Sequence, residues 1–113
     1  MAFRYIDKAR VATARSQVET ISLALNAYAL DCMRYPTQEQ GLEALWTKPS
    51  TEPVPSGWGG PYLTKKLSAD PWGRAYELVV PGPNGLPFGV RSLGADSKEG
   101  GEGNDKDISS WED

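Results

Sequence analysis

Residues 5–30 read YIDKARVATARSQVETISLALNAYAL, a pattern that predicts one long α-helix. No glycine or proline interrupts the stretch, and its apolar side chains recur at spacings of three and four, which places them on one face: Val11, Ala14, Val18, Ile21, Leu25 and Tyr28. At about 1.5 Å per residue the helix would be about 39 Å long, too long for so small a domain to cover completely. We therefore expect its first turns to protrude and to contact another subunit or lipid.

A short second helix is expected after the long one. Proline disfavours helical geometry in the residue before it, so the long helix should end near Pro36. Gln40 follows Thr37 by three residues, the spacing of a capping box, and this predicts a helix through Leu42 and Leu45. The stretch after that helix is rich in proline and glycine and is expected to be an irregular loop.

The second half of the chain carries the pattern of a small antiparallel sheet. The residues DPWG at positions 70–73 match a type I turn, and alternation over residues 75–80 predicts a strand with one face in the core. A proline- and glycine-rich turn separates it from a returning strand near residues 88–92. Since an isolated hairpin is barely stable, we expect this hairpin to pack on the long helix. The predicted fold class is therefore α+β.

The length of 113 residues suits one domain. We divide it into four expected segments: the long helix at 1–31, a short helix and loop at 32–73, a β-hairpin at 74–93 and a C-terminal loop at 94–113.

Composition argues against several classes of function. The chain has no histidine, which removes the usual general base and the commonest zinc ligand. Its single cysteine, Cys32, allows no disulfide within the chain and is interpreted as a small buried hydrophobic side chain at a helix end. The formal net charge is −3 and no basic stripe occurs, so no nucleic-acid partner is expected. We expect no enzymatic activity.

Residues 94–108, GADSKEGGEGNDKDI, hold five carboxylates and four glycines. Composition alone favours a solvated acidic tail. The alternative is a calcium loop, since Ca²⁺ takes roughly six to eight oxygens from carboxylates and backbone carbonyls, and glycine lets carbonyls turn inward. The spacing is not that of an EF-hand, and magnesium suits so long a loop poorly. The candidate carboxylate ligands are Asp96, Asp105 and Asp107, and the candidate carbonyls are those near Leu93, Ser97 and Glu99.

Four tryptophans could line a sugar-binding surface, which would make the chain an adhesive carbohydrate-binding module. Scattered tryptophans more commonly anchor loops to a core. Trp111, which follows the acidic loop, is expected to clamp the C-terminus. The members of this set are Trp46, Trp58, Trp72 and Trp111.

Several segments, taken in order, resemble the major pseudopilins of type II secretion. They are AYALD at 27–31, RYPT at 34–37, QGLEAL at 40–45, LSADPWG at 67–73, SLGAD at 92–96 and NDKDISSW at 104–111. The resemblance implies a pilin-like fold, with the second half of a long N-terminal helix packed on a small antiparallel sheet. It also implies a calcium ion in the C-terminal loop, bound where Asp96, Asp105 and Asp107 stand. The sequence departs from the family pattern at Ser97, where glycine is frequent, and at Lys106, which separates two acids that are adjacent in some members.

The resemblance implies a structural role as well. Subunits would assemble into a periplasmic filament that drives export of folded proteins across the outer membrane, together with minor pseudopilins and inner-membrane secretion components. The family's cleaved leader and apolar N-terminal helix do not occur in this sequence. We therefore interpret it as the periplasmic part of a protein anchored in the inner membrane of a Gram-negative bacterium. A type IV pilin and a minor pseudopilin remain the closest alternatives.

Overall fold

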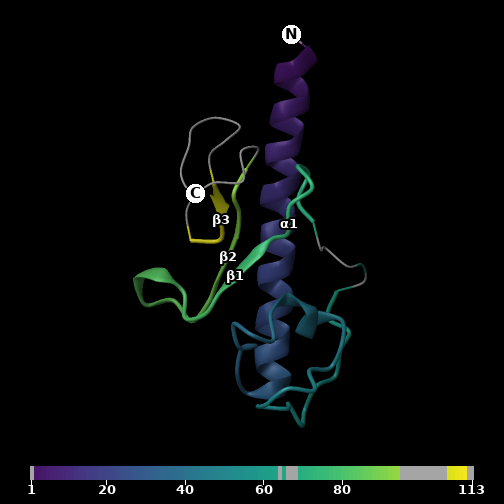
Figure 1. The fold of residues 1–113 in the computed structure, drawn as a ribbon, viewed down its shortest axis with the longest axis vertical. Helices are drawn as coiled ribbons and strands as arrows, with labels where there is room; N and C mark the ends of the chain where they lie inside the picture. The colour runs from purple at the N-terminus through teal and green to yellow at the C-terminus, as the bar shows by residue number, and fades with distance from the viewer. Residues whose placement is uncertain (1, 64, 66–68, 95–106, 112–113) are drawn as a thin grey trace.

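The computed structural model describes residues 2–63, 65, 69–94 and 107–111, the first six of them as backbone only. Its order of elements is α1 (Ala2–Cys32), the 3₁₀ helix η1 (Leu42–Leu45), β1 (Glu77–Val79), the 3₁₀ helix η2 (Pro83–Gly85), β2 (Gly89–Ser92) and β3 (Ile108–Ser109). Figure 1 shows α1 along the long axis, with the sheet against its middle and the loops after α1 around its lower end. The first turns of α1 extend beyond the sheet, as predicted.

Helix α1 packs the predicted face into the core. Ala14, Val18, Ile21, Leu25 and Tyr28 are all buried, and Val11, one turn earlier, is partly buried against them. The helix runs two residues further than the pattern indicated. It ends where Met33 adopts a left-handed conformation with φ of 65°, and the Met33 amide still donates to the Ala29 carbonyl at 2.9 Å.

The sheet has three strands in the order β1-β2-β3, all antiparallel. The predicted hairpin is present, with Leu78 opposite Val90 in the register of β1 and β2. The two residues of β3 form a third strand that the sequence pattern did not indicate. Ile108 is buried in the core, and it pairs with Ser92 on β2. Sheet and helix together form the predicted α+β fold, with α1 covering one face of the small antiparallel sheet.

The capping-box residues form the expected pair of hydrogen bonds, but these close a turn and do not begin the helix. The Thr37 amide donates to Gln40 Oε1 at 3.0 Å, and the Gln40 amide donates to Thr37 Oγ1 at 3.1 Å. Gly41 follows with φ of 65°, and the 3₁₀ helix η1 starts only after it. The Gln40 side chain also donates to the carbonyl of Pro53 at 3.0 Å, so it connects the turn to the later loop.

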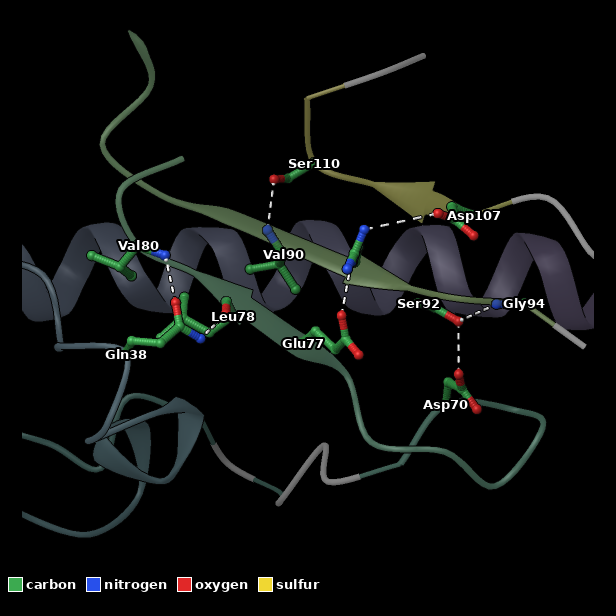
Figure 2. A network of polar contacts seen from close by, with 11 residues as sticks. Gln38, Asp70, Glu77, Leu78, Val80, Val90, Ser92, Gly94, Asp107 and Ser110 are labelled. Carbon is green, nitrogen blue, oxygen red and sulfur yellow. Dashed lines mark hydrogen bonds and ion pairs between the residues drawn. The ribbon is translucent and has the colours of Figure 1, made fainter. Parts of the chain in front are cut away.

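The segment after α1 is also attached to the sheet. Gln38 donates from Nε2 to the Leu78 carbonyl and accepts from the Val80 amide at 2.8 Å (Figure 2). Both bonds lie at the outer edge of β1. They fix the start of the 37–46 segment relative to the hairpin.

Candidate metal centre at the end of strands β2 and β3

Two of the six predicted calcium ligands lie within the described part of the chain, Leu93 and Asp107. The pairing of Ser92 with Ile108 places these two at the next facing positions, just beyond the ladder of β2 and β3. The other four, Asp96, Ser97, Glu99 and Asp105, lie outside the described residues. The fold therefore brings Leu93 and Asp107, which are fourteen positions apart in sequence, to facing positions.

Asp107 lies beside a cation of the middle strand. Its side chain is 22% exposed, and its Oδ2 is 4.0 Å from Nη1 of Arg91. The Arg91 Nε donates to Oε1 of Glu77 at 2.8 Å, across the ladder of β1 and β2. Arg91 thus lies between two carboxylates, and its positive charge faces the side chain proposed as a metal ligand.

The other end of the loop is fixed by a buried polar network that sequence reasoning did not find. Asp70, 5% exposed, opens the predicted turn: the Gly73 amide donates to its carbonyl at 2.9 Å. Its Oδ1 accepts from the amides of Trp72 and Arg74 at 3.0 and 2.9 Å. Its Oδ2 accepts from the hydroxyl of Ser92 at 2.7 Å.

Ser92 carries this network to the start of the loop. Its side chain is fully buried, and its Oγ accepts from the Gly94 amide at 3.2 Å. Gly94 has φ of 78°, a left-handed conformation that glycine adopts without strain. Figure 2 shows Gly94 and Asp107 at the same end of the sheet. The only sequence signal for this network would have been a serine in a predicted strand together with an aspartate in a predicted turn, 22 positions earlier in the chain.

The chemistry of the described donors fits a hard cation. A carboxylate and a backbone carbonyl are both ligands that Ca²⁺ takes readily. The Arg91 guanidinium near Asp107 is a competing positive charge, with which a bound cation would share this carboxylate. Within residues 2–63, 65, 69–94 and 107–111, no three acidic or cysteine side chains converge on one point. A complete shell would therefore need the candidate ligands between positions 95 and 106.

The tryptophans that could have formed a sugar-binding surface are used in packing. Trp46, Trp58 and Trp72 are partly buried against the core, and Trp58 Nε1 donates to the Ala44 carbonyl at 2.8 Å. The Trp111 ring lies on Gly89, where an added Cβ would come within 2.5 Å of it. Trp111 therefore clamps the C-terminal segment onto β2, as predicted.

Cys32 has the environment of a packing residue. It is partly buried at the end of α1, and burial is the main cause that raises the pKa of its thiol. A raised pKa lowers the thiolate fraction and with it the reactivity of the sulfur.

Across the described residues, no helix is long and apolar enough to span a bilayer.

Comparison with known proteins identifies one family. The sequence matches the family described as "Type II secretion system (T2SS), protein G" over residues 2–111. It is 47% identical over 106 residues to type II secretion system core protein G of Pseudomonas aeruginosa, covering 94% of this chain and 74% of that protein. Identity to the Vibrio cholerae protein of the same name is 44% over 105 residues, covering 93% and 70%.

A solved structure is also similar. It is the crystal structure of the major pseudopilin from the type 2 secretion system of enterohaemorrhagic Escherichia coli, which aligns with a TM-score of 0.79 and 36% sequence identity. The alignment covers 95% of this chain and 90% of that one.

Proposed function

The chain belongs to the type II secretion system protein G family, and from this membership we propose that it is a structural subunit of a periplasmic pseudopilus. Copies of the protein assemble into a filament that drives export of folded proteins across the outer membrane. Minor pseudopilins and inner-membrane secretion components are its other partners, and an inner-membrane anchor is part of the proposal. The role is structural and requires no catalysis.

One observation supports assembly most directly: the outer face of α1 exposes large apolar side chains. Leu23 is 71% exposed and Leu30 is 82% exposed, and their seven-residue spacing puts them on one side of the helix. Leu25, two residues after Leu23, is turned by about 200° and is fully buried against the sheet side. Burying one such leucine at an interface is worth about 1.5–3 kcal/mol, so a neighbouring copy would be stabilised by covering both.

A groove beside these residues could receive part of the neighbouring copy. It lies between α1 and β3 and has a volume of about 420 Å³. Its lining combines apolar, charged and hydroxyl side chains: Arg15, Val18, Glu19, Ser22, Leu23, Asn26, Ser109 and Ser110. Leu23 belongs to both the apolar face and the groove, which makes it the residue to test.

The test is a charge placed on this face of the full-length protein. We expect Leu23→Arg and Leu30→Arg to prevent filament formation, seen by negative-stain electron microscopy, and to stop export in cells that lack their own major pseudopilin. Leu86→Arg is the matched control, because Leu86 is also exposed but lies in the turn between β1 and β2. Normal filaments from the double Leu23→Arg, Leu30→Arg protein would contradict the proposed assembly face.

We further propose that the C-terminal loop binds one calcium ion. Asp96, Asp105 and Asp107 supply carboxylates, and carbonyls near Leu93, Ser97 and Glu99 complete the shell. The facing positions of Leu93 and Asp107 support this arrangement. An ion bound only by the ordered loop stabilises that order, by about 2.7 kcal/mol at a free concentration of about 100 times Kd.

Thermal unfolding with and without a chelator tests the calcium proposal. We expect chelation to lower Tm, and Asp96→Ala or Asp107→Ala to lower Tm and remove its dependence on calcium. Glu77→Ala is the control, because Glu77 also pairs with Arg91 but lies on β1, outside the loop. A Tm that is the same with calcium and with chelator would end the proposal.

A further inference from the structure

Exposed charges of opposite sign lie near the two ends of α1. Lys8 is exposed in the first turns of the helix, which extend beyond the sheet. Glu39 and Glu43 are exposed in the segment around the other end of the helix (Figure 1). None of these three side chains forms an ion pair with another residue that the structure describes.

Lys8 also has no acidic partner at helical spacing. Side chains of a helix meet at spacings of three and four residues. Asp7 stands three positions before Arg10, and Glu19 stands four positions after Arg15. No acid stands three or four positions from Lys8. Its charge is therefore available to another molecule.

Glu39 and Glu43 line a common pocket with a volume of about 250 Å³. Gln40 holds its walls together, because its Nε2 donates to the Thr51 carbonyl at 2.9 Å. Lys48 is the third charged residue of the lining, which therefore sums to a charge of −1. One further cation would balance it. We call this site the acidic pocket.

The acidic pocket has the chemistry to receive a lysine side chain. An ammonium group donates three hydrogen bonds, and the hydroxyl-bearing residues Thr47, Ser50 and Thr51 line the pocket together with the two carboxylates. Ala44 and Pro49 supply apolar surface, on which the aliphatic stem of a lysine can pack.

The cation has to come from a second molecule. From Lys8 to Cys32, the last residue of α1, the helix rises by about 36 Å, several times the Debye length of about 8 Å at physiological salt. The acidic pocket belongs to the segment around that far end (Figure 1). A second copy displaced by about this length along the helix axis would bring its own Lys8 level with the pocket.

We infer that Lys8 of one copy enters the acidic pocket of another copy along the filament, an inference that rests on the filament proposed above. The contact joins two different surfaces, so a copy whose pocket is filled still presents its own Lys8. A heterologous contact of this kind can repeat in an open filament, whereas a twofold contact ends at a dimer. It is separate from the contact proposed for Leu23 and Leu30.

Charge reversal in the full-length protein tests the contact, in cells that lack their own major pseudopilin. We expect Lys8→Glu to lower the amount of sheared filament, measured by negative-stain electron microscopy, about 5- to 10-fold, because like charges would meet at the pocket. Arg10→Glu is the matched control. Arg10 is also exposed but is turned by about 200° around the helix, so its reversal should change the amount by no more than about twofold.

A charge exchange identifies the partner side chain. Lys8→Glu combined with Glu43→Lys leaves the summed charge of the filled pocket unchanged, so we expect it to restore about half or more of the filament that Lys8→Glu loses. Lys8→Glu combined with Glu52→Lys is the control and should restore none, because Glu52 is an exposed acid outside the pocket lining.

A measurement on the unmodified filament keeps the test valid if a variant does not fold, as checked by circular dichroism. A carbodiimide joins an amine directly to a carboxylate that it touches. We expect mass spectrometry of the digested filament to find Lys8 joined to Glu39 or Glu43. The length of α1 means that this link connects two copies.

Each outcome decides the inference. Equal losses of filament in Lys8→Glu and Arg10→Glu overturn it, as does a charge exchange that restores nothing. A normal amount of filament with loss of export also overturns it, because the pocket would then receive a cation of another secretion component. These results leave the proposed function standing. If the unmodified protein forms no filament, the proposed function is overturned and the inference with it.

Discussion

Replacing Leu25 by alanine removes a side chain from the centre of the interface between helix and sheet. Leu25 has no exposed surface, and it lies in the same cluster as Ile21 and Tyr28 of α1 and Val90 of β2. The atoms lost would leave a cavity lined by both layers. Because α1 is held on two sides by the sheet and by the loops after it, the surroundings can fill this cavity only in part.

The expected cost follows from comparable core positions. Replacing a buried leucine by alanine lowers the free energy of unfolding of a protein by about 2–5 kcal/mol. The entropy of unfolding is about 2.1 cal/mol/K per residue, or about 240 cal/mol/K for this chain, so each kcal/mol lowers Tm by about 4 °C. We therefore expect Leu25→Ala to lower Tm by about 8–20 °C.

Leu23→Ala provides the control within the same helix. The substitution is identical, but Leu23 is 71% exposed, so its effect should stay within about 0.5 kcal/mol, or about 2 °C. Both variants are compared by circular dichroism during heating and by urea titration. Similar decreases in Tm for the two would refute the assignment of Leu25 to the buried face and Leu23 to the open face.

Three further predictions concern the sheet and the core. Gly89→Ala should cost about 1–3 kcal/mol and shift tryptophan emission, because the new methyl would meet the Trp111 ring; an unchanged emission maximum would speak against the clamp. A double-mutant cycle of Glu77→Gln and Arg91→Gln, followed by urea unfolding, should give a coupling of about 0.2–1 kcal/mol that decreases in high salt; zero coupling would contradict the cross-strand pair. Burial raises the pKa of Tyr28 from 10.0 to about 12, so the stability that the buried neutral phenol contributes is full below pH 10 and is lost as pH rises toward 12. Absorbance at about 295 nm, compared between the unmodified chain and Tyr28→Phe, follows this ionisation. Ionisation of Tyr28 near pH 10 would contradict the prediction.

The pattern of apolar residues predicted the helix and its buried face because a long periodic segment averages over local exceptions. The predicted end at residue 31 lies one residue before the observed end at Cys32, but the sequence did not show what ends the helix. Met33 supplies the left-handed residue that glycine usually supplies, and nothing in the letters around it shows this. In the same way, Thr37 and Gln40 made the bonds of a capping box, but Gly41 delayed the helix to the next turn.

Features that depend on register were not accessible from the sequence. Strand β3 has two residues, too few to show any alternation, and it exists only because β2 is there to pair with it. The same pairing places Leu93 opposite Asp107. Both residues had been proposed as ligands from their chemical type and from the family resemblance, and neither argument predicted that they face each other. Asp70 was interpreted as a turn residue, which it is, but its second oxygen reaches Ser92 on another element.

The position of the proposed calcium loop connects it to the proposed assembly face. For β3 to pair with β2, the fifteen residues between Ser92 and Ile108 must form a closed loop, at an entropic cost of about 2 kcal/mol. The hydrogen bonds of a two-residue strand offset little of this cost. An ion held at both ends of this segment would supply the difference. Ser109 and Ser110, at the end that such an ion would hold, form one wall of the groove whose other wall includes Leu23 of α1. Calcium bound as proposed would therefore maintain the groove that we propose a neighbouring copy contacts, and its removal would weaken the proposed assembly before it unfolds the core around Leu25.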